Sequence, residues 1–122
     1  MKKLFIISFL SLAVIFYSFT TKAAFVEGME DIPIAPDLEQ IQKNNFSFGN
    51  EETRIIEAYF SSKKTNYAKV ESFYLDTLAQ LGWTFMGKNK NKLIFKRNNE
   101  ELNVITEKKN PLIVRVTLTG KP

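Results

Sequence analysis

The stretch from Gly82 to Lys88 has the spacing of a phosphate-binding loop, G-x-x-x-x-G-K. Such a loop joins a strand to a helix, binds phosphate through backbone N–H groups and a lysine, and ends in Ser or Thr. Here the motif follows a predicted helix, bulky residues fill its centre, and Asn89 occupies the last position. We therefore predict no nucleotide site.

Ser61 and Lys64 have the S-x-x-K spacing of the nucleophilic serine and the lysine in penicillin-interacting enzymes. That chemistry also requires S-D-N and K-T-G elements within a far larger domain. The sequence contains neither element. We interpret these residues as part of a polar loop between a strand and a helix.

The composition removes the side chains on which most catalytic and metal sites depend. The chain has no His and no Cys, so serine, cysteine and metal hydrolases built on His are excluded. The neighbouring acids at Glu51–Glu52 and Glu100–Glu101 point apart on a strand or turn and cannot act as a catalytic pair. We predict a protein with no enzymatic activity, no metal and no cofactor.

Positive charge concentrates in one predicted hairpin, which carries Lys88, Lys90, Lys92, Lys96 and Arg97. A local positive field of this kind attracts anionic partners such as lipid headgroups or acidic polymers. Lysines also keep hairpin tips soluble and discourage pairing between sheet edges. We interpret the cluster as a solvated hairpin tip.

Residues 1–23 have the features of a bacterial signal peptide. Two lysines precede an apolar run over residues 4–19, which is shorter than the roughly 20 residues that span a bilayer. Small residues predict cleavage after Ala23, with cleavage after Ala24 as the second choice. We expect an exported, periplasmic protein. The alternative is an inner-membrane anchor formed by uncleaved residues 4–19.

Removal of the signal peptide lowers the net positive charge, which changes the kinds of partner that the charge favours. Lys2, Lys3 and Lys22 leave with it and no acid does, so the net charge of +4 falls to +1. In an exported, nearly neutral protein we expect no nucleic-acid partner. The absence of Cys leaves no thiol for lipid attachment, so we also expect no stable membrane anchor after cleavage.

We predict that residues 24–45 form an extended arm, because Pro33 and Pro36 fix their own backbone angles and favour extended conformations in the residues before them. A disordered linker would lack its large apolar side chains. These are Ile32, Ile34, Leu38 and Ile41. We expect the arm to lie against another part of the protein or against a partner.

Residues 46–122 predict a single α+β domain. A strand over residues 54–60 is followed by a helix that Thr65 or Asn66 can cap and Gly82 can end, with apolar residues at three- and four-residue spacing. The period then changes to two, which is typical of strands. Four strands are expected, at 83–86, 93–95, 102–106 and 112–119. The pattern predicts one amphipathic helix on an antiparallel sheet of about five strands, in the order β-α-β-β-β-β.

Alternation along these strands predicts which sheet face meets the helix. The face away from the helix would carry Ile94, Ile105 and Ile113 among charged residues that include Lys92 and Arg115. Such a face is too apolar to be plainly solvated and too charged to be a second core. Either the arm covers part of it or another molecule does.

Three stretches together resemble an uncharacterised family of short exported alphaproteobacterial proteins. The stretches are Asp31 to Pro33, Arg54 to Ala58 and Phe73 to Trp83. In that family an "IP" arm, an "RIxE" strand and an "FY…TL.QLGW" helix end recur in this order. The resemblance implies the fold and the compartment, and it assigns no activity.

From these observations we predict a non-catalytic interaction module of the periplasm or envelope, with an unknown envelope protein or component as its partner. The candidate interaction face is the one with the three isoleucines. The alternative is a carrier of a lipid or another small hydrophobic ligand, in which the aromatic helix and the sheet would enclose a cavity.

Overall fold

The computed structural model describes residues 24–41, 46–49 and 53–120, and the predicted signal peptide lies outside these residues. The strands are β1 (Phe25–Val26), β2 (Met29–Pro33), β3 (Glu39–Gln40), β4 (Phe46–Gly49), β5 (Arg54–Ser62), β6 (Thr84–Asn89), β7 (Lys92–Arg97), β8 (Glu100–Lys109) and β9 (Leu112–Gly120). The helix is α2 (Tyr67–Gln80). Within the described ranges, no helix has the length and apolar content needed to cross a bilayer.

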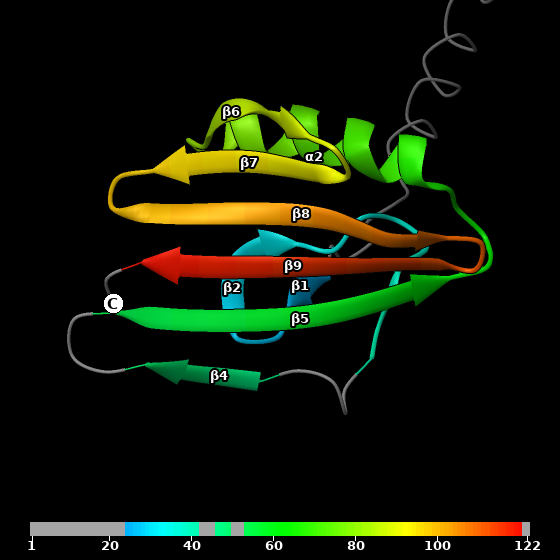
Figure 1. Ribbon diagram of the computed structural model, residues 1–122, viewed down its shortest axis with the longest axis horizontal. Helices are drawn as coiled ribbons and strands as arrows, with labels where there is room; N and C mark the ends of the chain where they lie inside the picture. The colour runs from blue at the N-terminus through cyan, green and yellow to red at the C-terminus, as the bar shows by residue number, and fades with distance from the viewer. Residues whose placement is uncertain (1–23, 42–45, 50–52, 121–122) are drawn as a thin grey trace, which may run out of the picture.

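One antiparallel sheet with the strand order β5-β9-β8-β7-β6 forms the body of the protein (Figure 1). β5 pairs with β9 along its whole length, and its other edge pairs with β3 near one end and with β4 near the other. A helix between β5 and four further strands is the predicted order, so the α+β class is confirmed. β3 and β4 both pair with the edge of β5 that is opposite β9.

Local signals in the sequence determine both ends of α2. The Asn66 side chain accepts a hydrogen bond of 3.0 Å from the Lys69 N–H at the N-terminus, which satisfies one of the free backbone donors there. Gly82 has a φ of +90° just after the C-terminus, a conformation that glycine adopts without steric cost. Both residues are placed as the sequence predicts.

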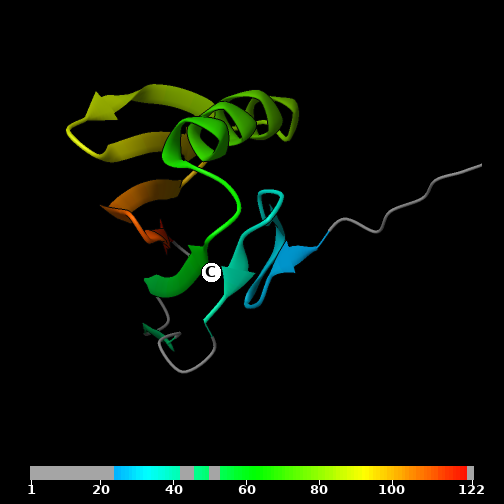
Figure 2. The ribbon, with the colours of Figure 1, turned by 90° about the vertical axis from the view of Figure 1, so that its right-hand side faces the viewer.

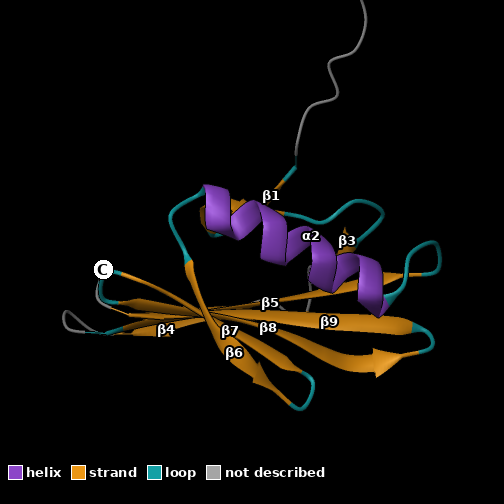
Figure 3. Ribbon diagram, turned by 90° about the horizontal axis from the view of Figure 1, so that it is seen from above, coloured by secondary structure: helices purple, strands orange, loops and turns teal. Residues whose placement is uncertain are grey.

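The protein has two layers, because α2 and the hairpin of β1 and β2 lie on the same side of the sheet (Figures 2 and 3). α2 lies behind the β6 and β7 side of the sheet in Figure 1, and the hairpin lies behind β9 and β5. The sheet side chains that face this layer are buried. They include Ile56, Ala58, Phe60, Leu93, Phe95, Leu102, Val104, Leu112, Val114, Val116 and Leu118. We call the opposite side of the sheet the outer face.

The described part of the predicted arm packs into this same core. It forms the hairpin β1–β2 and continues to β3, and its buried side chains are Val26, Met29, Ile32, Ala35 and Leu38. Tyr74 of α2 connects the two, since its hydroxyl donates to the Pro33 carbonyl at 2.8 Å and accepts from the Ala35 N–H at 3.1 Å. Of the two explanations considered for the outer face, cover by the described part of the arm is excluded.

Tyr74→Phe should destabilise the fold without changing its shape. The substitution removes one oxygen from a fully buried side chain and leaves the Pro33 carbonyl and the Ala35 N–H without a partner, at a cost of about 1–3 kcal/mol. Urea unfolding followed by circular dichroism measures this loss.

Tyr67→Phe is the matched control, because the Tyr67 ring is only partly buried at the edge of the core. If the two variants unfold at the same urea concentration, the Tyr74 hydroxyl does not hold the arm.

Candidate functional site

The five residues of the predicted interaction face all lie on the outer face, on three neighbouring strands. Lys92 and Ile94 belong to β7, Ile105 to β8, and Ile113 and Arg115 to β9. The register places Lys92, Ile105 and Arg115 directly opposite one another across the three strands. The structure therefore brings them together as one surface, although only their alternation along each strand was visible in the sequence.

The isoleucines of this face are more covered than the sequence suggested. Ile105 has only 8% of its surface exposed, and Ile94 and Ile113 are half-buried. The direct cross-strand neighbours of Ile105 are Lys92 and Arg115, whose long side chains have apolar stems that can lie over it. What the face presents outward is therefore largely charge, with apolar side chains between.

Arg115 is held between two carboxylates that come from different strands. Its Nη1 lies 3.0 Å from an oxygen of Glu57 on β5, and its Nε lies 2.9 Å from an oxygen of Glu107 on β8. Partial burial opposes the charged form of Arg115, but the hydrogen bonds and charges of Glu107 and Glu57 outweigh it and raise the pKa of the guanidinium. These two acids fix the side chain in place. The sequence pattern places Glu107 on this face, but it predicts neither ion pair.

A buried amide lies beside Arg115 on the same face. Asn103 is almost fully buried, and its Nδ2 donates to Glu101 at 3.2 Å and to Thr117 at 3.4 Å. These bonds satisfy the Asn103 Nδ2, whereas its buried Oδ1 has no hydrogen-bond partner among the described residues. Together with Arg115, Asn103 gives the centre of the outer face a fixed pattern of polar groups, which is the property that a specific docking surface requires.

Two hollows in the surface border the candidate face. One, of about 320 Å³, is lined by Asn89, Lys90, Asn91, Lys92, Ile105, Glu107 and Arg115. The other, of about 460 Å³, is lined by Asp37, Glu39, Ser61, Ser62, Lys63, Lys64, Pro111 and Ile113. A partner that covers the face therefore has room to insert side chains at both ends of it.

The S-x-x-K segment forms a turn at the second hollow. The Ser62 hydroxyl accepts hydrogen bonds from the backbone N–H groups of Lys64 and Thr65, at 2.9 and 3.1 Å. This is the local side-chain to backbone bonding that Ser provides in turns. Ser61 and Ser62 are the last residues of β5, so the strand is two residues longer than predicted and the polar loop to α2 begins at Lys63.

The positive hairpin is divided between the two sides of the sheet. Lys88 forms an ion pair of 3.0 Å with Glu71 of α2, and Arg97 also turns to the helix side. Among the described residues, Lys90, Lys92 and Lys96 have no acidic partner within ion-pair distance. The free charge is therefore smaller than the sequence suggests and lies at the tip and on the outer face.

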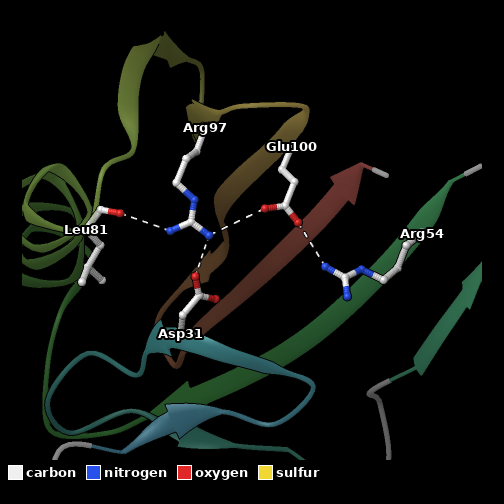
Figure 4. Close-up of polar contacts among 5 residues, drawn as sticks. All are labelled: Asp31, Arg54, Leu81, Arg97 and Glu100. Atoms are coloured by element: carbon white, nitrogen blue, oxygen red, sulfur yellow. Dashed lines mark hydrogen bonds and ion pairs between the residues drawn. The ribbon is translucent and has the colours of Figure 1, made fainter. Parts of the chain in front are cut away.

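Arg97 forms a second polar cluster, which joins five parts of the chain (Figure 4). Its guanidinium donates to the Leu81 carbonyl at the end of α2 at 3.1 Å and pairs with Asp31 of β2 and with Glu100. Glu100 also pairs with Arg54 of β5 at 3.0 Å. Two arginines and two acids balance one another, so the cluster is a structural joint between the arm, the helix and the sheet.

The remaining groups give little basis for cofactor or metal binding. The G-x-x-x-x-G-K stretch runs from the end of α2 into β6, and its Trp83 is buried under the Arg97 guanidinium, 4.2 Å from the ring centroid. In the part of the chain that the structure describes, no three acidic side chains gather closely enough to hold a metal ion.

Comparison of the chain with protein-family models found no match, and searches of curated proteins and of solved structures found no similar protein. The resemblance to short exported alphaproteobacterial proteins stays a prediction.

Arg97→Ala should destabilise the protein more than Arg54→Ala. Arg97 makes bonds to three elements and stacks on Trp83, whereas the more exposed Arg54 has Glu100 as its ion-pair partner. We expect a loss of about 1–3 kcal/mol for Arg97→Ala and less than about 1 kcal/mol for Arg54→Ala. Urea unfolding at low salt measures both. Equal losses would show that the joint does not depend on Arg97.

Proposed function

We propose that this protein is a non-catalytic interaction module of the bacterial envelope, which binds a partner protein through the outer face. The observation that carries this proposal is the placement of Lys92, Ile94, Ile105, Ile113 and Arg115 on three paired strands, on the side opposite α2 and the β1–β2 hairpin. A partner would contact side chains that are already held in position.

The fixed geometry of Arg115 supports recognition by this face. Binding costs entropy whenever loose side chains become ordered, and a preformed pattern lowers that cost. Arg115 is held by Glu57 and Glu107 before any partner arrives. Arginine is also enriched among the residues that dominate binding energy at protein interfaces. Arg115 is therefore the residue that we expect to contribute most.

The packing between α2 and the sheet favours an interaction module over a carrier of a lipid or another hydrophobic ligand. A carrier would hold its ligand between these layers. Tyr74, Phe60 and Phe95 fill that space with side chains that are at most 1% exposed. The hollows at the outer face open to solvent beside charged residues, which suits a protein surface better than a lipid chain.

The proposal includes export to the periplasm. The support is the arrangement of residues 1–23, with lysines, an apolar run and small residues before the first described strand. The inner-membrane anchor by uncleaved residues 4–19 is the alternative. The mass of the protein isolated from the envelope fraction distinguishes the two, because cleavage removes the first 23 or 24 residues.

Site-specific photo-cross-linking in cells that express the full-length sequence tests the outer face. A photoreactive residue at Ile94 or Ile113 should give an adduct of one defined size, and the same residue at Ala68 or Ser72 on the exposed side of α2 should not. Arg115→Ala should reduce the adduct yield at Ile94 about tenfold, the change that corresponds to the loss of ~1.4 kcal/mol of binding free energy.

Two outcomes of the cross-linking experiment would contradict the proposal. Adducts of the same size and yield from Ala68 and from Ile113, or none from any position, would mean that the outer face is not the binding surface. Lys69→Ala serves as the matched charge control for Arg115→Ala, because Lys69 is exposed and belongs to α2, on the side of the sheet opposite the outer face.

A further inference from the structure

Four of the five exposed large apolar side chains, among the residues whose burial the structure describes, lie at or near β6. Five such side chains have between 37% and 55% of their surface exposed. Four of them lie in the second half of α2, just after it, or in β6. These four are Leu75, Leu81, Phe85 and Met86, and the fifth is Phe25 of β1. A local concentration of exposed apolar surface is typical of an interaction site.

β6 is also an edge of the sheet. It pairs with β7 on one side, and no other described strand pairs with it. An edge strand leaves a row of backbone N–H and C=O groups that can pair with another extended chain. Backbone donors and exposed apolar side chains thus occur together along β6.

The contacts between α2 and β6 show that these apolar side chains border the free edge. The ion pair between Lys88 and Glu71 identifies the side of α2 that faces β6, and Leu75 lies one helical turn after Glu71 on that side. Phe85 points to the helix side as well, because it lies opposite the buried Phe95 and the two ring centroids are 5.4 Å apart. An added strand would lie beside Leu75 and Phe85.

An irregularity in β6 exposes a further apolar side chain. The pairing with β7 shifts between Phe85 and Gly87, so that Met86 is an extra residue in the edge strand. Such bulges redirect a side chain and are frequent next to functional sites. Met86 has 55% of its surface exposed, and its flexible side chain adapts to varied partners.

The charge beside this edge selects the occupant. Lys90 lies in the turn next to β6, and Lys92 and Lys96 lie on the outer side of the neighbouring β7. Among the described residues, these three lysines have no acidic partner within ion-pair distance. A second copy of the chain would bring the same lysine-rich hairpin to the edge, and like charges oppose that pairing. Acidic side chains on the added strand would instead meet the lysines.

We infer that β6 binds an extended segment of another protein by strand addition, and that this segment alternates acidic and apolar residues. Its backbone pairs with the free edge of β6, its apolar side chains contact Leu75, Phe85 and Met86, and its acids lie near Lys90. This site is separate from the outer face and does not depend on the function proposed for that face.

A synthetic peptide of about eight residues that alternates glutamate and valine tests the inference. The protein is purified from cells expressing the full-length sequence, and binding is followed by fluorescence anisotropy of the labelled peptide. We expect saturation below about 1 mM and no saturation for a peptide with lysine in place of glutamate. Hydrogen exchange measured by NMR should show that amides of β6 become protected.

Substitutions at the edge should weaken peptide binding, and matched substitutions elsewhere should not. Leu75→Glu, Met86→Glu and Lys90→Glu each should raise the dissociation constant about tenfold or more, because each places negative charge near the acidic peptide. Phe25→Glu and Lys63→Glu are the controls, since both residues are exposed and belong to other parts of the fold. Circular dichroism checks that every variant is folded.

Several results would overturn the inference. Absence of saturation with the acidic peptide, equal weakening by Met86→Glu and Phe25→Glu, or binding without protection of β6 amides would each exclude strand addition at this edge. Concentration-dependent dimerisation in analytical ultracentrifugation, with protection of the same amides, would identify a second copy as the occupant and also contradict it.

Discussion

The packing of the N-terminal segment into the core beside α2 is the constraint on which the rest of the structure depends, and the Tyr74 hydroxyl stabilises it. This hydroxyl accepts from Ala35 and donates to Pro33 in the core, so that the N-terminal segment lies beside α2 on one side of the sheet. The chain has no Cys and thus no disulfide to hold this segment, and a domain of this size needs the burial that the segment adds. Because helix and hairpin occupy the same side, the outer face and the β6 edge are left for other molecules.

The ends of the helix and the order of the later strands could be predicted, because both depend on residues that are close together in the sequence. Asn66 and Gly82 mark the ends of α2, and the change from a helical period to alternation predicted the order of the later strands. The β1–β2 hairpin was not predicted, because its stability comes from contacts such as Ile32 with the core and Tyr74 with Pro33, which lie far apart in the sequence. Two-residue strands such as β3 likewise form because a neighbouring strand is present, and their own sequence is a weak signal.

The candidate face was predictable in its composition and less so in its exposure. Alternation is enough to place Ile94, Ile105 and Ile113 on one side of a sheet. How far Ile105 is covered depends on which long side chains lie opposite it, and that requires the register of β7, β8 and β9. The ion pairs of Arg115 could not be predicted either, because they also depend on the strand register and Glu57 lies 58 residues away in the sequence.

The distribution of ion pairs explains how a nearly neutral domain can still have a charged surface. All three arginines in the sequence, Arg54, Arg97 and Arg115, are paired with acids in the structure. A guanidinium has several donors in a fixed plane, so one arginine can join two carboxylates from different strands, which a lysine does less well. The arginines therefore stabilise the fold, and the positive charge of Lys90, Lys92 and Lys96 is left at the hairpin tip and on the outer face of β7, next to the β6 edge. The two proposed surfaces differ accordingly: the outer face offers side chains already fixed by ion pairs, and β6 offers backbone groups that any extended chain can pair with. Selectivity at β6 must then come from the charge and from Leu75, Phe85 and Met86.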